Sequence, residues 1–414
     1  MKASSTGYVR PLFFLALLFL SAFFTVAQDS NSVITDIQIE GLRRTKLSTA
    51  ERPLQKFIGI EVSLIDENDV KAAILATGIL EPVSVEITGQ TLTVTVREKW
   101  AIFPIPIFMG GSGEIGGGLS FFDANAFGLN DKLFLAGLYY SGAWIASAGY
   151  IHSATDSGIP GWSSTVAFTR AQRQDRNQNN ETLRRFNLDS ISASLGISVP
   201  LGNILNNLSA STLLSFRDTK LRPSDNAVNS PLDDARIFGI GARISIGRNS
   251  WDGFLLSREA ASLRYVYYAD FSSTSFHSVR LNGTWEKSLL PGFRLTTRTG
   301  LSFEPRVPIL FESSPGVSQV DILPISFSAR SYAGLSAGLE KYLVRFSVGT
   351  LTVLAAYQIV YSDGSILGNS FDHGYMGMLS FYLNRFAMPG LGAGFAYNVD
   401  KRYFQVTFGM GGSF

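Results

Sequence analysis

The sequence predicts a membrane β-barrel: a 16-stranded antiparallel transmembrane barrel preceded by one small β-α-α-β-β domain. Three observations support this prediction. Only 16% of the 414 residues are charged, whereas ordinary soluble proteins contain about 25%. From Trp100 onward, segments of about ten residues alternate apolar with small or polar side chains, as in barrels that face lipid outside and water inside. The residues before Trp100 instead combine helical and strand periods.

Residues 1–27 read as a secretory signal peptide. Lys2 and Arg10 supply a basic start, "PLFFLALLFLSAFF" is the apolar core, and "TVA" before Gln28 offers small residues for cleavage. A transmembrane anchor is the alternative, but the run is short for a bilayer. The sequence contains no cysteine, which excludes disulfides, thiolate metal sites and lipoprotein attachment.

The sequence of residues 33–98 predicts a small α+β domain. The strand "VITDIQIEG" is followed by two helical stretches and by the hairpin "VSVEITGQTLTVTVREK", which turns at Gly89. Asp66 is the expected N-cap of the second helix, and Gly78 is expected to end it. The first helix is weaker, because Pro53 removes a backbone donor soon after it begins.

The barrel is predicted over residues 101–414. Long connections follow only the odd-numbered strands five, seven, eleven and thirteen, as expected when a chain enters a barrel from one side. A soluble β-sandwich is the alternative, but it seldom needs so much alternation behind a signal peptide. The sixteen predicted strands are 102–110, 113–122, 131–141, 143–152, 162–171, 184–199, 207–217, 235–247, 258–269, 274–286, 291–304, 335–346, 350–361, 373–384, 390–398 and 402–413.

The charged residues do not predict a cofactor, a metal site or a nucleic-acid partner. The formal net charge is only +2 and is dispersed along the chain. His152, His277 and His373 lie far apart, without metal-ligand spacing. The remaining charged side chains within the predicted strands are expected to line a water-filled lumen; they include Arg243, Arg264, Arg280, Glu286 and Glu340.

Several motifs resemble the BamA-type outer-membrane assembly and two-partner secretion superfamily, whose members carry periplasmic POTRA domains before a barrel. "IQIEGLRRTK" and "LATGILEPVSVEI" look like parts of a POTRA domain. "DANAFGLNDKL", through Asn125, Phe127 and Gly128, looks like the "N-x-FG" turn after the second barrel strand. The resemblance implies a barrel in the outer membrane with one POTRA domain, residues 33–98, in the periplasm.

The resemblance also implies that the long loop after strand eleven folds into the lumen through a "VRGY-like" tetrad. The matching residues are Ala329, Arg330, Ser331 and Tyr332, with serine in place of the family's glycine. A lumenal guanidinium can hold such a loop by a charge-assisted contact with a carboxylate. The resemblance places that carboxylate at Asp363. Strand alternation, however, puts Asp363 on the same side of the strand as the tyrosines that are expected to face outward, so the contact requires a bulge or the end of the strand at this position.

The first and last strands are expected to form a weak seam. Pro104 and Pro106 each remove a ladder donor from the first strand. Gly409, Gly411 and Gly412 leave the last strand without packing side chains. A closed barrel must pair these two strands, so the seam is the part of the wall that is easiest to open.

The final stretch "QVTFGMGGSF" alternates to its end, with Gln405 and Thr407 expected to face the lumen. The apolar residues that alternate with them are expected to face lipid. Together with the terminal Phe, they resemble the C-terminal signal by which barrel proteins are recognised for assembly. These residues are Phe404, Val406, Phe408, Met410 and Phe414.

The resemblance implies two functions that remain open at this point. The first is insertion or assembly of outer-membrane proteins, in which the POTRA edge strand captures an extended client and the seam opens laterally. The second is a substrate-specific secretion pore, and a non-translocating structural barrel is a further alternative. The expected partners are outer-membrane lipid, unfolded or extended client polypeptides, and periplasmic chaperones or accessory lipoproteins. With room for a single POTRA domain, a specialised role is favoured, and no enzymatic activity is expected.

Overall fold

The computed structural model describes two separate units of the chain. The first comprises residues up to Arg43 together with Ala50–Arg97, and the second comprises Arg44–Thr49 and the chain from Glu98 onward. The predicted signal peptide lies outside the described residues. These are 32–111, 114–140, 143–154, 159–176, 182–201, 208–231, 233–252, 255–271, 275–313, 321–323, 327–364, 368–383 and 391–410.

The N-terminal unit is built on a three-stranded sheet in the order β1-β3-β2, with β1 parallel to β3. The helices that accompany the sheet are short, and no helix in the described part of the chain is long and apolar enough to cross a membrane. The elements of this region are β1 (Asp36–Glu40), α2 (Leu47–Glu51), the 3-10 turns η1 (Arg52–Phe57) and η2 (Val62–Leu64), α3 (Glu67–Ala76), β2 (Leu80–Thr88) and β3 (Thr91–Glu98).

Local sequence signals explain where these elements begin and end. Asp66 caps α3, because its Oδ1 accepts a hydrogen bond from the Asn68 backbone N–H at 2.8 Å. Gly78 after α3 and Gly89 in the hairpin both adopt positive φ, of 75° and 62°. The α-helix α2 ends at Glu51 and continues as a 3-10 turn that contains Pro53. The proline therefore shortens the first helix but does not abolish it.

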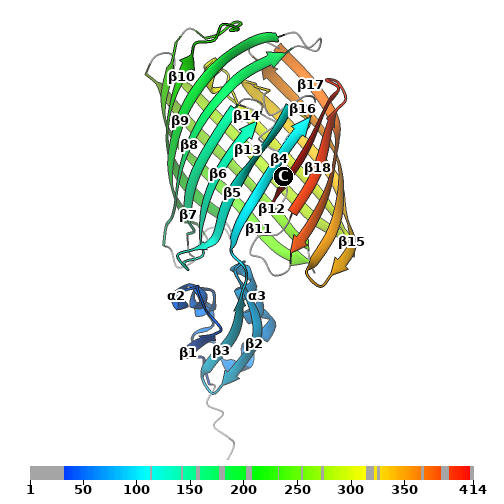
Figure 1. Cartoon of the computed structure of the whole chain (residues 1–414). Coiled ribbons are helices and arrows are strands. Elements are labelled where there is room, and N and C mark those ends of the chain that lie inside the picture. Colours follow the sequence, from blue (N-terminus) through cyan, green and yellow to red (C-terminus); the bar gives the residue numbers. More distant parts are fainter. Residues whose placement is uncertain are drawn as a thin grey trace, which may run out of the picture. The chain divides into compact units, whose positions relative to one another are not determined.

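The second unit is a closed antiparallel barrel of sixteen strands (Figure 1), which confirms the predicted fold class. Neighbours in sequence are neighbours in the wall throughout, and β19 closes on β4. The strands are β4 (Ile102–Gly111), β5 (Glu114–Ala126), β6 (Asp131–Tyr140), β7 (Ala143–His152), β8 (Gly161–Arg176), β9 (Thr182–Pro200), β10 (Leu208–Arg222), β11 (Ala235–Asp252), β12 (Leu255–Asp270), β13 (Phe276–Leu290), β14 (Phe293–Phe303), β15 (Ser331–Phe346), β16 (Gly349–Gly364), β17 (Gly368–Leu383), β18 (Leu391–Asn398) and β19 (Tyr403–Met410).

Several strands are longer than predicted. β8 continues to Arg176, five residues past the end expected from its apolar alternation. The extension is polar and is held by side-chain pairs across to β9, such as Gln174 Nε2 to Thr182 Oγ1 at 2.9 Å. Apolar periodicity detects only the part of a strand that lies in lipid, so polar extensions beyond the membrane were missed.

The barrel wall is apolar outside and polar inside. Along β15, Tyr332, Ser336 and Glu340 are buried on the lumenal side. Leu335 and Leu339 alternate with them and are 44% and 51% exposed on the outer face. A continuous exposed apolar surface of this kind is stable only against lipid. The barrel therefore spans a membrane.

Two ends of the barrel are distinguished by their connections. The short-turn end carries the tight connections β13–β14 and β15–β16, and the long-loop end carries the connection between β14 and β15, residues 304–330. Because successive strands are antiparallel, β4 begins at the short-turn end. The tight turn at Gly292, with a φ of 79°, needs glycine.

A six-residue segment that precedes the barrel in sequence, Arg44–Thr49, packs with the barrel unit. The Arg44 guanidinium of this segment forms an ion pair with Asp123. The Asn125 side chain of the "N-x-FG" turn donates a hydrogen bond to the Thr45 hydroxyl at 2.9 Å. Gly128 has a φ of 73°, and a Cβ there would lie 2.3 Å from a carbonyl oxygen of the segment. The turn motif thus builds a close backbone approach that only glycine permits.

Candidate functional site

The seam between β4 and β19 is the shortest ladder in the described barrel wall. Its register comprises three pairs: Val406 with Gly110, Thr407 with Met109, and Phe408 with Phe108. Every other pair of adjacent strands has a register of at least eight pairs. Among the described residues, the seam therefore has the fewest paired positions to hold the barrel closed.

The two prolines of β4 lie on the edge that faces the seam. The Ala124 N–H donates to the carbonyl of Ala101 at 2.8 Å, so odd-numbered residues here direct their backbone groups towards β5. Backbone direction alternates along an antiparallel strand, which turns the even-numbered residues towards β19. Pro104 and Pro106 are even-numbered, and the register with β5 is unbroken. The donors that they lack are therefore lost from the seam alone.

The last strand has the alternation expected from the sequence over the part that is described. Phe404 and Val406 are 44% and 46% exposed on the outer face, and Gln405 is buried on the lumenal side. The backbone of Gly409 lies within β19 and pairs with β18. The side chains of Thr407, Phe408 and Met410 lie outside what the structure describes, as do residues Gly411, Gly412 and Phe414.

The described parts of the loop between β14 and β15 lie inside the barrel. Ile322 and Leu323 are completely buried, and they form an apolar cluster with the loop residue Phe327. This cluster also includes Val360 from β16 and Ala396 from β18. The loop thus fills part of the lumen and contacts β16 and β18 of the wall, and β18 adjoins the seam strand β19.

The "ARSY" residues anchor the end of this loop at the start of β15. Ala329 is completely buried and Tyr332 is 4% exposed. Ala329 exchanges two backbone hydrogen bonds with Ser313, at 2.9 and 3.0 Å, which closes the loop on itself. Ser331 is half-buried, and its hydroxyl accepts a hydrogen bond from the Glu304 N–H at 3.1 Å.

Arg330 does not form the ion pair with Asp363 that the resemblance implied. The two residues meet through the backbone, where the Arg330 N–H donates to the Asp363 carbonyl at 2.8 Å. β16 has no bulge near Asp363, so its side chain keeps the parity of the outward-facing residue Tyr361. The Arg330 guanidinium instead lies 4.0 Å from Glu312 of the same loop.

Glu312 is the carboxylate that fixes the loop to the opposite wall. Its side chain is fully buried and pairs with Arg184 of β9, which is 1% exposed, at 2.8 Å. Arg184 also donates to the loop residue Ser328 at 3.0 Å. Arg173 of β8 donates to the Glu312 and Ile309 carbonyls at 3.3 and 3.1 Å. Sequence analysis missed this contact, because no local pattern relates positions 128 residues apart.

A second ion-pair network lies along the lumenal side of the wall near the short-turn end. Arg294 of β14 lies between two carboxylates, Glu286 at 3.4 Å and Glu340, and donates to the Tyr382 hydroxyl at 3.0 Å. Thr352 also donates to Glu340. The charged side chains are at most 5% exposed. Buried charges are tolerated when they are paired and hydrogen-bonded, so this network joins five neighbouring strands at that end.

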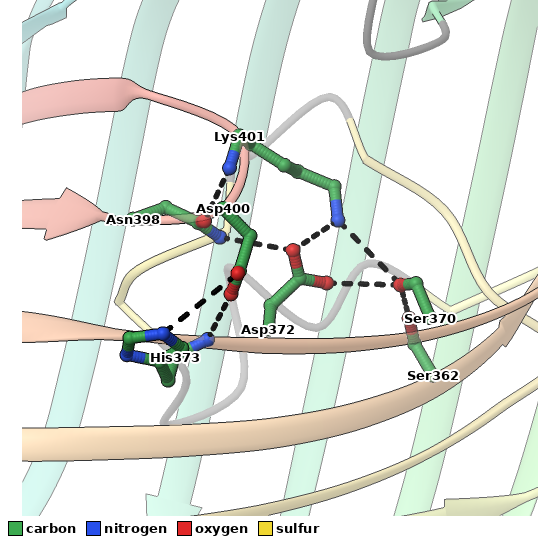
Figure 2. Close-up of polar contacts among 7 residues, drawn as sticks. All are labelled: Ser362, Ser370, Asp372, His373, Asn398, Asp400 and Lys401. Atoms are coloured by element: carbon green, nitrogen blue, oxygen red, sulfur yellow. Dashed lines mark hydrogen bonds and ion pairs between the residues drawn. The ribbon is translucent and has the colours of Figure 1, made fainter.

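Figure 2 shows polar contacts that hold the turn between β18 and β19 to β17. Asp372 is 1% exposed, forms an ion pair with Lys401, and accepts hydrogen bonds from Asn398 at 3.4 Å and Ser370 at 2.9 Å. Beside it, the His373 N–H donates to Asp400 at 2.8 Å. The spacing Asp372-x-Gly matches the "D-x-G" part of the motif sought near Asp363, and this carboxylate does face the lumen.

The lumenal loop also contacts the last strand and its turn. The Gln405 side chain of β19 donates to the Asp321 carbonyl. Gln358 of β16 donates to the Asp321 carboxylate at 3.0 Å, and its own oxygen accepts from the Ile322 N–H at 3.2 Å. The Lys401 ammonium lies 5.3 Å above the Phe327 ring. One side of the seam is therefore fastened to the loop.

The three histidines occupy separate strands and have separate partners. His152 contacts Asp131 at 2.8 Å, whereas the Nδ1 atoms of His277 and His373 contact tyrosine hydroxyls at 2.7 and 2.9 Å. Each histidine thus has a local partner in the wall.

Comparison with known proteins finds likeness in structure but not in sequence. No protein-family model matches the chain, and no curated protein matches it. CdiB from Escherichia coli superposes with a TM-score of 0.59 at 15% identity, covering 92% of this chain and 76% of that one. CdiB from Acinetobacter baumannii gives 0.58 at 14%, covering 92% and 73%.

BamA from Haemophilus ducreyi, in a form lacking POTRA domains 1–3, gives a TM-score of 0.55 at 14% identity and covers 91% of this chain and 84% of that one. At such identities the likeness concerns the fold, and the number of POTRA domains stays a prediction. The sixteen-stranded barrel closed by β4 and β19 is shared with these structures, and the chain therefore has the fold of the BamA and CdiB superfamily that its sequence motifs resemble.

Proposed function

We propose that the chain inserts or translocates other polypeptides at the bacterial outer membrane, and that the β4–β19 seam opens laterally to do so. The observation that carries this proposal is the short seam, which has three pairs among the described residues and whose β4 edge lacks the donors of Pro104 and Pro106. A client strand could pair with an opened edge of this kind by β-augmentation.

The register gives the scale of the weakness. In the seam, Val406 and Phe408 form the hydrogen-bonded pairs, each of which exchanges two bonds. The β18–β19 ladder contains eight pairs, half of which are hydrogen-bonded. With a net contribution of about 1 kcal/mol per bond, opening the seam costs about 4 kcal/mol less than opening its neighbour. Lateral opening is thus directed to one position in the wall.

The lumenal loop supports lateral opening over threading through the lumen. Ile322, Leu323 and Phe327 occupy the interior, and the Arg184–Glu312 pair fixes the loop across it. A client that threads the lumen must displace these buried contacts, whereas a client that enters at the seam need not. Release of Gln405 from Asp321 would free β19 as the seam opens.

The N-terminal unit is proposed to be a periplasmic POTRA domain that delivers clients. β1 and β2 are the two edges of its sheet, and Val83 on β2 is 59% exposed. An exposed sheet edge pairs readily with an extended peptide. The same edges would serve accessory lipoproteins or chaperones. The proposed work is noncovalent, and no enzymatic step is assigned.

Depletion of the protein followed by quantification of the outer-membrane proteome tests this function. If the proposal holds, specific barrel proteins fall in abundance, and expression of the wild-type chain restores them. A chain that keeps the fold but has a longer seam, such as the double variant P104V/P106V, should restore them poorly. An unchanged set of barrel proteins after depletion would reject the insertion function.

A substrate-specific secretion pore is the second candidate, and the polar attachment of the loop favours it. Apart from the Arg184–Glu312 pair, the loop is fastened to β8, β16 and β19 through side-chain hydrogen bonds, which a client can exchange. Single-channel recording in planar bilayers discriminates between the two. A large and frequently open conductance supports the pore, and a nearly closed barrel supports insertion at the seam.

A further inference from the structure

Three arginines lie side by side on adjacent strands of the lumenal wall. Arg243 of β11 is directly opposite Arg264 of β12, which is directly opposite Arg280 of β13. The neighbouring outward-facing residues are apolar and exposed, such as Leu263 and Leu281, so the arginines point inward. Like charges directly opposite one another destabilise a sheet unless something compensates them.

A cavity of about 220 Å³ lies beside this row and is lined by Arg264, Arg280 and a further arginine, Arg217 of β10. The one carboxylate among its lining residues is Glu304. That carboxylate is already engaged by Arg280 at 2.8 and 3.1 Å, and by the hydroxyls of Ser278 and Ser313 at 2.5 and 3.0 Å. The cavity thus retains an excess of positive charge.

The other two arginines of the cavity, Arg217 and Arg264, have guanidinium N–H donors that can still bind an acceptor. Within the described residues, neither Arg217 nor Arg264 forms an ion pair, and the Arg264 Nε is buried without a hydrogen-bond partner. The Arg217 guanidinium lies 5.7 Å from the Phe311 ring of the lumenal loop, and its side chain is open to lumenal water. Unsatisfied buried donors and unpaired cations both favour an added anion.

The positive lining continues into a second cavity of about 380 Å³. It is lined by Arg243 and Arg258, together with serine, threonine and asparagine side chains, and by no carboxylate. Arg243 also donates to Ser262 at 3.1 Å. Both cavities are therefore lined by members of one arginine row, which we define as Arg217, Arg243, Arg264 and Arg280.

We propose that the arginine row binds a multivalent oxyanion inside the barrel. Guanidinium groups bind phosphate and carboxylate oxygens through paired, charge-assisted hydrogen bonds, and arginine-lined pores select anions by the same chemistry. The bound anion would compensate the repulsion across β11, β12 and β13. This site goes beyond the proposed function and does not depend on it.

Inorganic phosphate is the probe for the first test, with the full chain purified in detergent. We expect phosphate to raise the melting temperature more than sodium chloride does at equal ionic strength, because it binds the folded barrel. In R264Q the apparent dissociation constant should rise about tenfold or more, as expected for losing a charge-assisted contact. R243Q should weaken binding in the same direction.

R248Q is the matched control, since Arg248 lies on the same strand as Arg243 but is already paired with Glu259 at 2.9 Å. It should bind phosphate as the wild type does. Without phosphate, R264Q should melt no lower than the wild type, because repulsion is relieved, and this also shows that the variant folds. Equal effects of phosphate and chloride, or an unchanged response in R264Q, would overturn the proposal.

Competition by a short oligoglutamate peptide identifies the source of the oxyanion. If the peptide displaces phosphate from the wild type and from R248Q, the arginine row also accepts carboxylates of a polypeptide. If phosphate binds and the peptide does not compete, the ligand is a small anion. Both results support the site.

Discussion

Replacing Pro106 by valine should strengthen the seam. Pro106 is exposed and belongs to the edge of β4 that faces β19. If the seam register continues, position 106 comes opposite Met410, the last described residue of β19. Valine suits an outward-facing strand position and supplies the missing backbone N–H. The substitution therefore offers β19 one more ladder donor, next to the last pair that the described residues form.

The structure sets the size of this effect. One restored backbone hydrogen bond contributes about 1 kcal/mol net, which lowers the equilibrium constant for seam opening about fivefold. The double variant P104V/P106V supplies two donors to the edge that faces β19, and each bond that forms should lower the opening constant about fivefold. The β4–β5 register should be unaffected, because Pro104 and Pro106 pair with Phe121 and Leu119 at positions whose backbone groups point away from β5.

Hydrogen exchange measures the opening directly. The amides of Val406 and Phe408 face β4, so their exchange in detergent micelles reports the seam. In P106V they should exchange about fivefold more slowly, and activity should fall in parallel. P200V, at the end of β9 and away from the seam, is the control and should leave both quantities unchanged. Faster exchange at Val406, or undiminished activity in a more protected seam, would refute the reasoning.

Three further predictions concern the lumenal contacts. R294M should lower the free energy of unfolding by about 3–5 kcal/mol, because it leaves Glu340 buried without its cation. Denaturant unfolding in detergent measures this change, and an unchanged unfolding midpoint would contradict it. E312Q should release the lumenal loop, seen as more frequent openings in single-channel recordings, and a conductance like that of the wild type would argue against its anchoring role. K401M removes the cation beside the buried Asp372 and should speed hydrogen exchange in the β18–β19 turn, whereas unchanged exchange there would show that the ion pair does not hold the turn.

The barrel could be predicted from sequence because lipid outside and water inside select side chains with the same period along every strand. In β15 and β16 that alternation is almost unbroken, from Tyr332 to Glu340 and from Thr352 to Ser362. Strand ends were less predictable. The polar extension of β8 to Arg176 is stabilised by contacts across to β9, and no local pattern records such a partner.

Only part of the candidate site could be predicted from the sequence. The prolines of β4 indicated a weak seam, but the direction of their missing donors required the register with β5. The resemblance pointed to Arg330 and Asp363, whose side chains do not pair because Asp363 keeps the outward parity of its strand. The contact that does anchor the loop, Arg184 with Glu312, joins distant segments and follows from the folded lumen alone.

A disulfide across the seam tests the central claim of lateral opening most directly. Met109 and Thr407 are backbone register partners in the seam, at a pair without mutual hydrogen bonds, where Cα atoms approach to about 4.5 Å and a disulfide fits. The sequence has no cysteine, so the double variant M109C/T407C contains a single possible bridge. Neither single-cysteine variant can form that bridge, and each should remain active.

The measurement is client insertion by the oxidised double variant, before and after reduction with a thiol. Lateral opening predicts that the oxidised protein is inactive, that reduction restores its activity, and that the barrel remains folded throughout. Full activity in the oxidised, crosslinked protein would contradict the account.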